Sequence, residues 1–192
     1  MGQLATLFRN YQNPFEVLAE QGRMFAANMG TVTTPLTFLV TAANRPDAWV
    51  RNPLGAVMLP YSLAVTLEAM AGTATEIDVR IASNDIGDGT SSAASVSRSL
   101  RTDAPVASLC TARQLATANT TAETTPVSVY RKTYILANAA GEDAKGGLIT
   151  REQMGNPICV NASTWELFVA ATTTQAVGFV VMTWAEVPAT WL

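Results

Sequence analysis

The stretch EIDVRIA, residues 76–82, decides the fold class that the sequence predicts. Ile77, Val79 and Ile81 alternate along it with the charged residues Asp78 and Arg80. Successive side chains of a β-strand point to opposite faces, so this alternation puts the three aliphatic side chains on one face and both charges on the other. The sequence therefore predicts a strand that is buried on one face and wet on the other.

The same period of two recurs from residue 31 onward. We expect further strands in TVTTPLTFLVT (31–41), YSLAVTLEA (61–69), AASVSRSL (93–100), PVASLCTA (105–112), PVSVYRKTYIL (126–136), PICV (157–160), STWELFVAAT (163–172) and AVGFVVMTWAEV (176–187). Glycine, asparagine, proline and serine separate these segments, and no domain linker is visible. About eight or nine short strands with such turns predict an all-β fold, an antiparallel β-sandwich and specifically a jelly roll, as one domain over residues 31–192.

Residues 1–30 have a different pattern and are expected to form an N-terminal arm that is partly helical. Asn13 is a good N-cap residue, Pro14 suits the first helical position, and Glu16 completes a capping box. A helix starting there would run until Gly30, a residue that commonly ends helices.

The first part of this arm carries apolar residues at helical spacings, namely Leu4, Leu7, Phe8 and Tyr11. An apolar stripe of this kind is normally laid over another surface. The sequence leaves open whether that surface belongs to the same subunit or to a neighbouring one.

The composition limits the partners of the protein. Of the 192 residues, 48% are hydrophobic and only 14% are charged, and the formal net charge is −3. A surface that must be covered with so few charges usually meets other proteins. No cationic cluster is present that would neutralise several phosphates, and no apolar run is long enough to cross a bilayer, so we expect neither nucleic acid nor membrane as a partner.

The stretch NDIGDGTS, residues 84–91, is the segment that most resembles a metal loop. An EF-hand needs oxygen ligands at its third and fifth positions and a glutamate at the twelfth. Counted from Asp85, these positions hold Gly87, Gly89 and Val96. We therefore expect a turn between two strands, with no bound metal and no other cofactor.

The sequence also argues against catalysis. Histidine is absent, which removes the commonest general base and most catalytic zinc sites. The carboxylate pair Glu142 and Asp143 lies in the segment 138–156, which we expect to be a long surface loop. Cys110 and Cys159 sit in apolar surroundings and are interpreted as small buried hydrophobes. We predict that the protein is not an enzyme.

Aromatic and apolar residues near the chain ends are the best candidates for contacts with other proteins. Trp165 and Trp184 fall inside expected strands and should be core, whereas Trp49 lies between proline-bearing turns and should be at the surface. The last expected strand is apolar on both faces and must be covered on both sides. The candidate interface residues are Leu4, Leu7, Phe8, Tyr11, Trp49, Trp191 and Leu192.

An apolar N-terminal arm, a domain rich in alanine, threonine, serine and valine, no histidine and the aromatic terminus PATWL together resemble the small virion structural proteins of tailed bacteriophages. The similarity is to head decoration or cement proteins with jelly-roll folds. It implies a homo-oligomer, with a trimer favoured, that is assembled in the host cytoplasm and binds the major capsid protein or another protein of the virion.

Other functions compatible with the sequence are a tail-tube or connector protein, and a carbohydrate- or receptor-binding β-sandwich in which Trp49 stacks on a sugar ring. A third alternative is a small hydrolase that uses Glu142 or Asp143.

Overall fold

A computed structural model of the protein describes residues 2–10, 13–31, 33–38, 46–70, 74–82, 92–115, 126–135, 145–160, 162–171 and 176–192. Two short helices come first, and strands follow. The elements are α1 (Gln3–Asn10), α2 (Pro14–Glu20), β1 (Met24–Met29), β2 (Leu36–Phe38), β3 (Ala48–Arg51), β4 (Ala56–Met70), β5 (Ala74–Ala82), β6 (Ser92–Ser95), β7 (Ser97–Ser99), β8 (Thr111–Leu115), β9 (Val127–Ile135), β10 (Lys145–Thr150), β11 (Cys159–Val160), β12 (Thr164–Ala171), β13 (Ala176–Pro188) and the 3-10 helix η1 (Ala189–Trp191).

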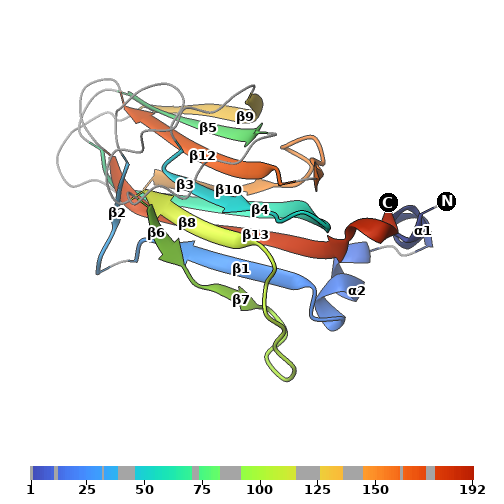
Figure 1. The fold of residues 1–192 in the computed structure, drawn as a ribbon. Helices are drawn as coiled ribbons and strands as arrows, with labels where there is room; N and C mark the ends of the chain where they lie inside the picture. The colour runs from blue at the N-terminus through green and yellow to red at the C-terminus, as the bar shows by residue number, and fades with distance from the viewer. Residues whose placement is uncertain are drawn as a thin grey trace.

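The strands form two antiparallel sheets that lie one above the other (Figure 1). Sheet A has the order β10-β4-β13-β1-β7, with β11 added to β4 and β2 added to β13. Sheet B has the order β6-β8-β3-β12-β5-β9. The predicted antiparallel β-sandwich is thereby confirmed, while the jelly-roll connectivity stays a prediction.

The main core lies between the two sheets. Its side chains come from alternate positions of the strands, as the period of two requires, and EIDVRIA forms β5 with Ile77 and Val79 fully buried. Trp165 and Trp184 are also buried in this core, as the sequence predicts.

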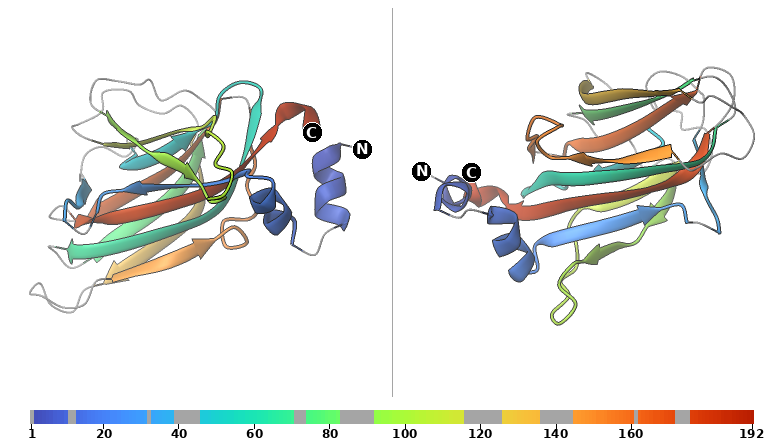
Figure 2. Two further views of the ribbon diagram at one scale, coloured as in Figure 1. Left: turned by 90° about the horizontal axis from the view of Figure 1, so that it is seen from below. Right: turned by 180° about the vertical axis from the view of Figure 1, so that it is seen from behind.

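A second, smaller core lies on the other side of sheet A. Met24, Leu59 and Ala185 face away from the sandwich, because they alternate with residues of the main core and pair with one another across β1, β4 and β13. The helices α1 and α2 cover them with Leu4, Leu7, Phe15 and Leu18. Both helices therefore sit over one end of the outer face of sheet A (Figure 2).

The expected helix over residues 13–30 is wrong in its second half. It starts at Pro14 but ends at Glu20, where Gly22 takes φ 71° and the amides of Gly22 and Arg23 donate to the carbonyls of Ala19 and Leu18. This is a Schellman motif, which stops a helix and redirects the chain. The chain then forms strand β1, so the expected boundary between arm and sandwich at residue 30 is also wrong.

The start of α2 confirms only part of the expected cap. Pro14 lies in the first turn, but the Asn13 side chain makes no capping hydrogen bond, so the capping box does not form.

Two other expected strands are shorter or divided. In the described part of residues 31–41, which leaves out residue 32 and residues 39–41, β2 is the only strand. The segment 93–100 contains both β6 and β7, which belong to different sheets, so the chain crosses from sheet B to sheet A at Val96.

The expected strand at residues 105–110 is wrong. Backbone amides at the end of this segment donate to a buried carboxylate and not to a neighbouring strand. Glu186, which is 4% exposed, accepts from the amides of Leu109 at 2.8 Å and Cys110 at 3.3 Å. The hydroxyl of Ser108 and the indole nitrogen of Trp184 also donate to it. The segment is thus tied to a side chain of β13, and β8 starts only at Thr111.

The expected surface loop at residues 138–156 is wrong for its middle part, which forms β10. Gly146 lies so close to β4 that a Cβ atom would be 2.3 Å from the carbonyl oxygen of Val65. Gly146 therefore allows close approach of two strands and does not mark a loop. Residues 138–144 lie outside the described residues.

We predict that Glu186→Ala lowers the free energy of unfolding by about 3 kcal/mol, because buried donors lose a charged acceptor. Urea denaturation measures this loss. The control is Asp103→Ala, which removes a carboxylate whose side chain is 71% exposed and should leave the midpoint unchanged. Equal midpoints for both variants would show that Glu186 does not hold the segment.

We also predict that neither cysteine reacts with a thiol reagent at pH 8 while the protein is folded. Cys110 and Cys159 are free and buried, which confirms their interpretation as buried hydrophobes. Burial raises the pKa of both thiols, so they stay protonated at pH 8, and the protonated form is not the nucleophile. Labelling of native and urea-unfolded protein, followed by mass spectrometry, checks this. Rapid native labelling would contradict it.

Candidate interaction surface

The two ends of the described chain lie side by side at one end of the sandwich (Figure 2). Helix α1 contacts η1, and Gly2 is so close to the carboxyl end that a Cβ atom there would be 2.1 Å from the carbonyl oxygen of Leu192. The described candidates of both ends, Leu4, Leu7, Phe8, Trp191 and Leu192, are thus brought close together.

The structure separates these residues into buried and exposed ones. Leu4 and Leu7 are 6% and 7% exposed and pack in the second core, so the N-terminal arm lies over its own subunit. Phe8 and Leu192 are 39% and 59% exposed. Trp191 is partly buried against the second core, and Tyr11 lies outside the described residues.

Trp49 is not at the surface, and the expectation that it contacts partners is wrong. It is 1% exposed in β3, where it is paired with Glu166 of β12 and Arg113 of β8. The proline-bearing turns around it suggested a loop, but the four residues Ala48–Arg51 are an inner strand of sheet B. A sugar ring has no access to a side chain buried to this extent.

An apolar groove of about 420 Å³ runs over the terminal surface. Its lining includes Leu4, Ala5 and Phe8 of α1, Ile158 and the terminal Leu192. Ile158 is 48% exposed. Three large apolar side chains are therefore partly open to water around one concave site.

A buried arginine supports the floor of this groove. Arg151 is 4% exposed, and its guanidinium donates to the carbonyl oxygens of Pro60 and Pro157, each at 2.7 Å, and of Asn156 at 3.2 Å. It also lies 5.4 Å from the centre of the Phe15 ring. Burial lowers the pKa of the Arg151 guanidinium. This side chain fixes the turn after β10 against β4 and α2.

Aromatic contacts hold the helices onto the sheet beside the groove. The rings of Phe8 and Phe15 meet edge to face with 5.6 Å between centroids, and Phe15 lies 4.7 Å from the ring of Tyr61 on β4. Arg23 lies over the Trp191 ring at 4.9 Å. Such pairs add to the energy of burial and fix the orientation of the helices.

The described residues contain no candidate metal site. Within them, no group of three or more histidine, cysteine, aspartate or glutamate side chains could hold a metal ion. The stretch NDIGDGTS and the carboxylates Glu142 and Asp143 lie outside the described residues. None of the described helices has the length and apolar character that a membrane span requires.

Sequence reasoning missed Arg151 and Ile158. Both lie in or near a segment whose glycines and charges suggested a solvated loop. The usable signal was the apolar Ile158, which lies between Pro157 and the first residue of β11, Cys159.

Comparison of the chain with protein-family models, curated proteins and solved structures finds no match. The candidate surface is therefore interpreted from its own geometry.

We predict that Arg151→Met destabilises the protein by about 2 kcal/mol, because buried carbonyl oxygens lose their donor while the volume of the side chain is retained. Urea denaturation monitored by tryptophan fluorescence measures the change. Lys132→Met, at an exposed position of β9, is the control and should have little effect. A neutral Arg151→Met variant would show that the guanidinium does not support the groove.

Proposed function

We propose that the protein is a virion structural protein, specifically a capsid decoration or cement protein, which acts by associating with itself and with a capsid shell. The observation that carries the proposal is the apolar groove at the terminal surface, with Phe8, Ile158 and Leu192 partly exposed around it. Exposed apolar side chains that are gathered at one concave site are typical of protein interfaces.

The chemistry of the chain supports a role in association. It carries 14% charged residues and no histidine, and the groove is lined mainly by apolar side chains. Hydrophobic burial needs no reactive group and is proportional to the area that is covered. A shell protein that presents an apolar segment or ridge would fit this groove.

The carbohydrate-binding alternative loses the residue on which it depended, because Trp49 is buried. Another position in the virion, such as the tail tube or connector, would use the same kind of surface and is distinguished by the particle to which the protein binds.

We predict that the protein binds saturably to undecorated heads of a tailed phage whose genome encodes it. The double variant Phe8→Asp/Leu192→Asp should bind at least about 100-fold more weakly, because two apolar contacts are lost and charges enter the interface. Co-sedimentation with purified heads gives both binding curves.

The matched control is Val127→Asp on β9, where the valine is 62% exposed, close to the 59% of Leu192. This control should bind like the parent. Absence of saturable binding by the parent protein would refute the decoration function, and equal binding by the double variant would exclude the groove. Circular dichroism confirms that each variant keeps its β-structure.

A further inference from the structure

The outer face of sheet A is covered over only part of its area. At one end, α1 and α2 lie over Met24, Leu59 and Ala185 in the second core. Further along the same strands the side chains that continue this face are only half-buried or exposed. We call this second part the uncovered half; it consists of Ala26, Asn28, Ser62, Ala64, Thr66, Arg98, Leu148, Thr150, Phe179, Val181 and Thr183.

The strand register places these residues in transverse rows. One row runs Leu148–Ala64–Val181–Asn28 across β10, β4, β13 and β1. The next row runs Thr150–Ser62–Thr183–Ala26–Arg98 and extends to β7. Residues in such rows share one face of the sheet. Small and aliphatic side chains therefore fill the middle of the uncovered half.

The charges of the described side chains lie at its margins. Arg98 is on the edge strand β7, and the exposed Glu68 follows Thr66 by two residues at the end of β4. The outer face of sheet B is different. There Asp78 bonds Arg80 at 2.7 Å and Arg131 at 3.0 Å, and Arg131 also bonds Glu76. The outer face of sheet B thus carries a network of ion pairs, whereas the described charges of the uncovered half stand at its rim.

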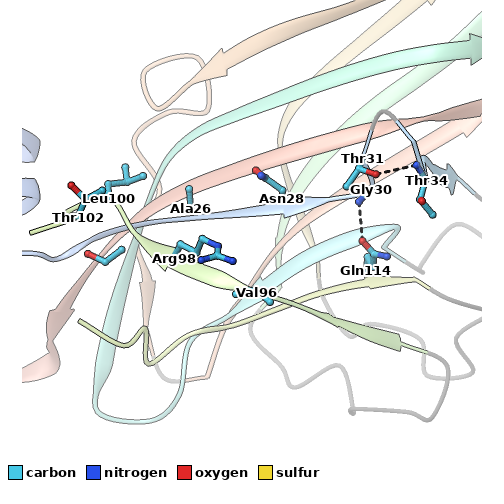
Figure 3. A pocket seen from close by; sticks show the side chains of 11 residues that line it. Ala26, Asn28, Gly30, Thr31, Thr34, Val96, Arg98, Leu100, Thr102 and Gln114 are labelled. Atoms are coloured by element: carbon cyan, nitrogen blue, oxygen red, sulfur yellow. Dashed lines mark hydrogen bonds between the residues drawn. The ribbon is translucent and has the colours of Figure 1, made fainter. Parts of the chain in front are cut away.

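A hollow of about 590 Å³ marks one side of the uncovered half, over β1 and β7. Figure 3 shows Val96 and Arg98 along one side of the hollow, Ala26 and Asn28 along the other, and Leu100 and Thr102 at its end. The amide of Gly30 donates to the side-chain oxygen of Gln114 at 2.9 Å and fixes the end of β1 at this hollow.

A protruding side chain marks the opposite side. Leu148, on the edge strand β10, is 60% exposed. It belongs to the same row as Asn28, which lines the hollow. The middle strand β13 lies between them, two strands from β10 on one side and two strands from β7, whose Arg98 also lines the hollow, on the other. A protrusion and a hollow that lie two strands away on either side of one central strand are self-complementary under a two-fold rotation about an axis parallel to that strand and above the face.

The area of the uncovered half can be compared with the area that a specific interface covers. The eleven side chains of the uncovered half each occupy a repeat of about 4.8 Å by 6.8 Å, which gives about 360 Å² of flat sheet. Specific interfaces cover about 600 to 800 Å² of accessible surface on each partner. Accessible surface exceeds the flat area because side chains stand out from the sheet, and the rim residues Val96 and Leu100, 67% and 50% exposed, enlarge the face toward that range.

We propose that a second copy of this chain packs on the uncovered half. The two copies are related by a two-fold axis that lies between the sheets and runs parallel to β13, so that Leu148 of each copy enters the hollow of the other. The proposal rests on the proposed function in that it names the surface through which the protein associates with itself. Sheets commonly pack face to face about 10 Å apart with their strands nearly aligned, which this axis produces. Arg98 stays at the rim, where its guanidinium reaches water.

Sedimentation of the isolated protein tests the contact without any capsid. We expect a dimer, and we expect Leu148→Asp and Val181→Lys each to raise its dissociation constant at least about 100-fold, since every change occurs twice in the interface. Val127→Asp is matched to Leu148→Asp in exposure, 62% against 60%, but lies on sheet B and should leave the dimer intact. A monomeric parent, a trimer, or a dimer that neither variant weakens would overturn the proposal.

Cross-linking tests the axis itself and does not depend on destabilising variants. The double variant Val96→Cys/Leu148→Cys should form disulfide-linked dimers on mild oxidation, whereas Leu148→Cys alone should not. Within one subunit these positions lie at opposite edges of sheet A, about 19 Å apart, which is too far for a disulfide. A dimer that the double variant does not cross-link overturns this arrangement.

The two proposals fail separately. A parent protein that binds heads but sediments as a monomer refutes the sheet contact and leaves the decoration function in place. A dimer that binds no heads refutes the decoration function and leaves the sheet contact in place.

Discussion

The pairing of β13 with β4 is the interaction on which the rest of the structure depends. It extends over Ala176–Pro188, and β1, β2, β10 and β11 are added to one or the other of these two strands. Its inner residues enter the main core, and its last outward residues, Ala185 and Val187, enter the second core. Glu186, between them, anchors residues 108–110. One strand pair therefore positions the sandwich, the helices and the connecting segment.

The sequence predicts those elements in which local pattern and tertiary environment agree. EIDVRIA is a strand in both respects, because one face meets the core and the other carries ion pairs. Strands β1 and β10 were missed for physical reasons. A Schellman motif at Gly22 interrupts an otherwise helical spacing, and Gly146 in β10 allows the close approach to Val65. The close approach depends on the neighbouring strand β4, whereas the Schellman motif forms within residues 18–23.

The candidate surface was predictable only in part. The apolar termini predicted a contact, and the structure brings them together. The side chains of Leu4 and Leu7, however, are buried in the second core of the same subunit. Trp49 shows the reverse error, since its neighbouring prolines suggested exposure and the sheet buries it. Composition gives the amount of apolar surface that must be covered. Only the fold decides which copy of the chain covers it.

The outer face of sheet A shows which apolar side chains the subunit covers by itself and which it does not. A strand with apolar residues on both faces, such as β13, needs cover on both sides. The sandwich covers the inner side, and α1 and α2 cover the outer side at Ala185 and Val187. The helices are too short to reach Val181 and Phe179, which stay half-buried. The helical arm thus covers part of the face within the subunit and leaves the rest as a flat surface with few charges. A second sheet of the same kind covers such a surface without burying an unpaired charge.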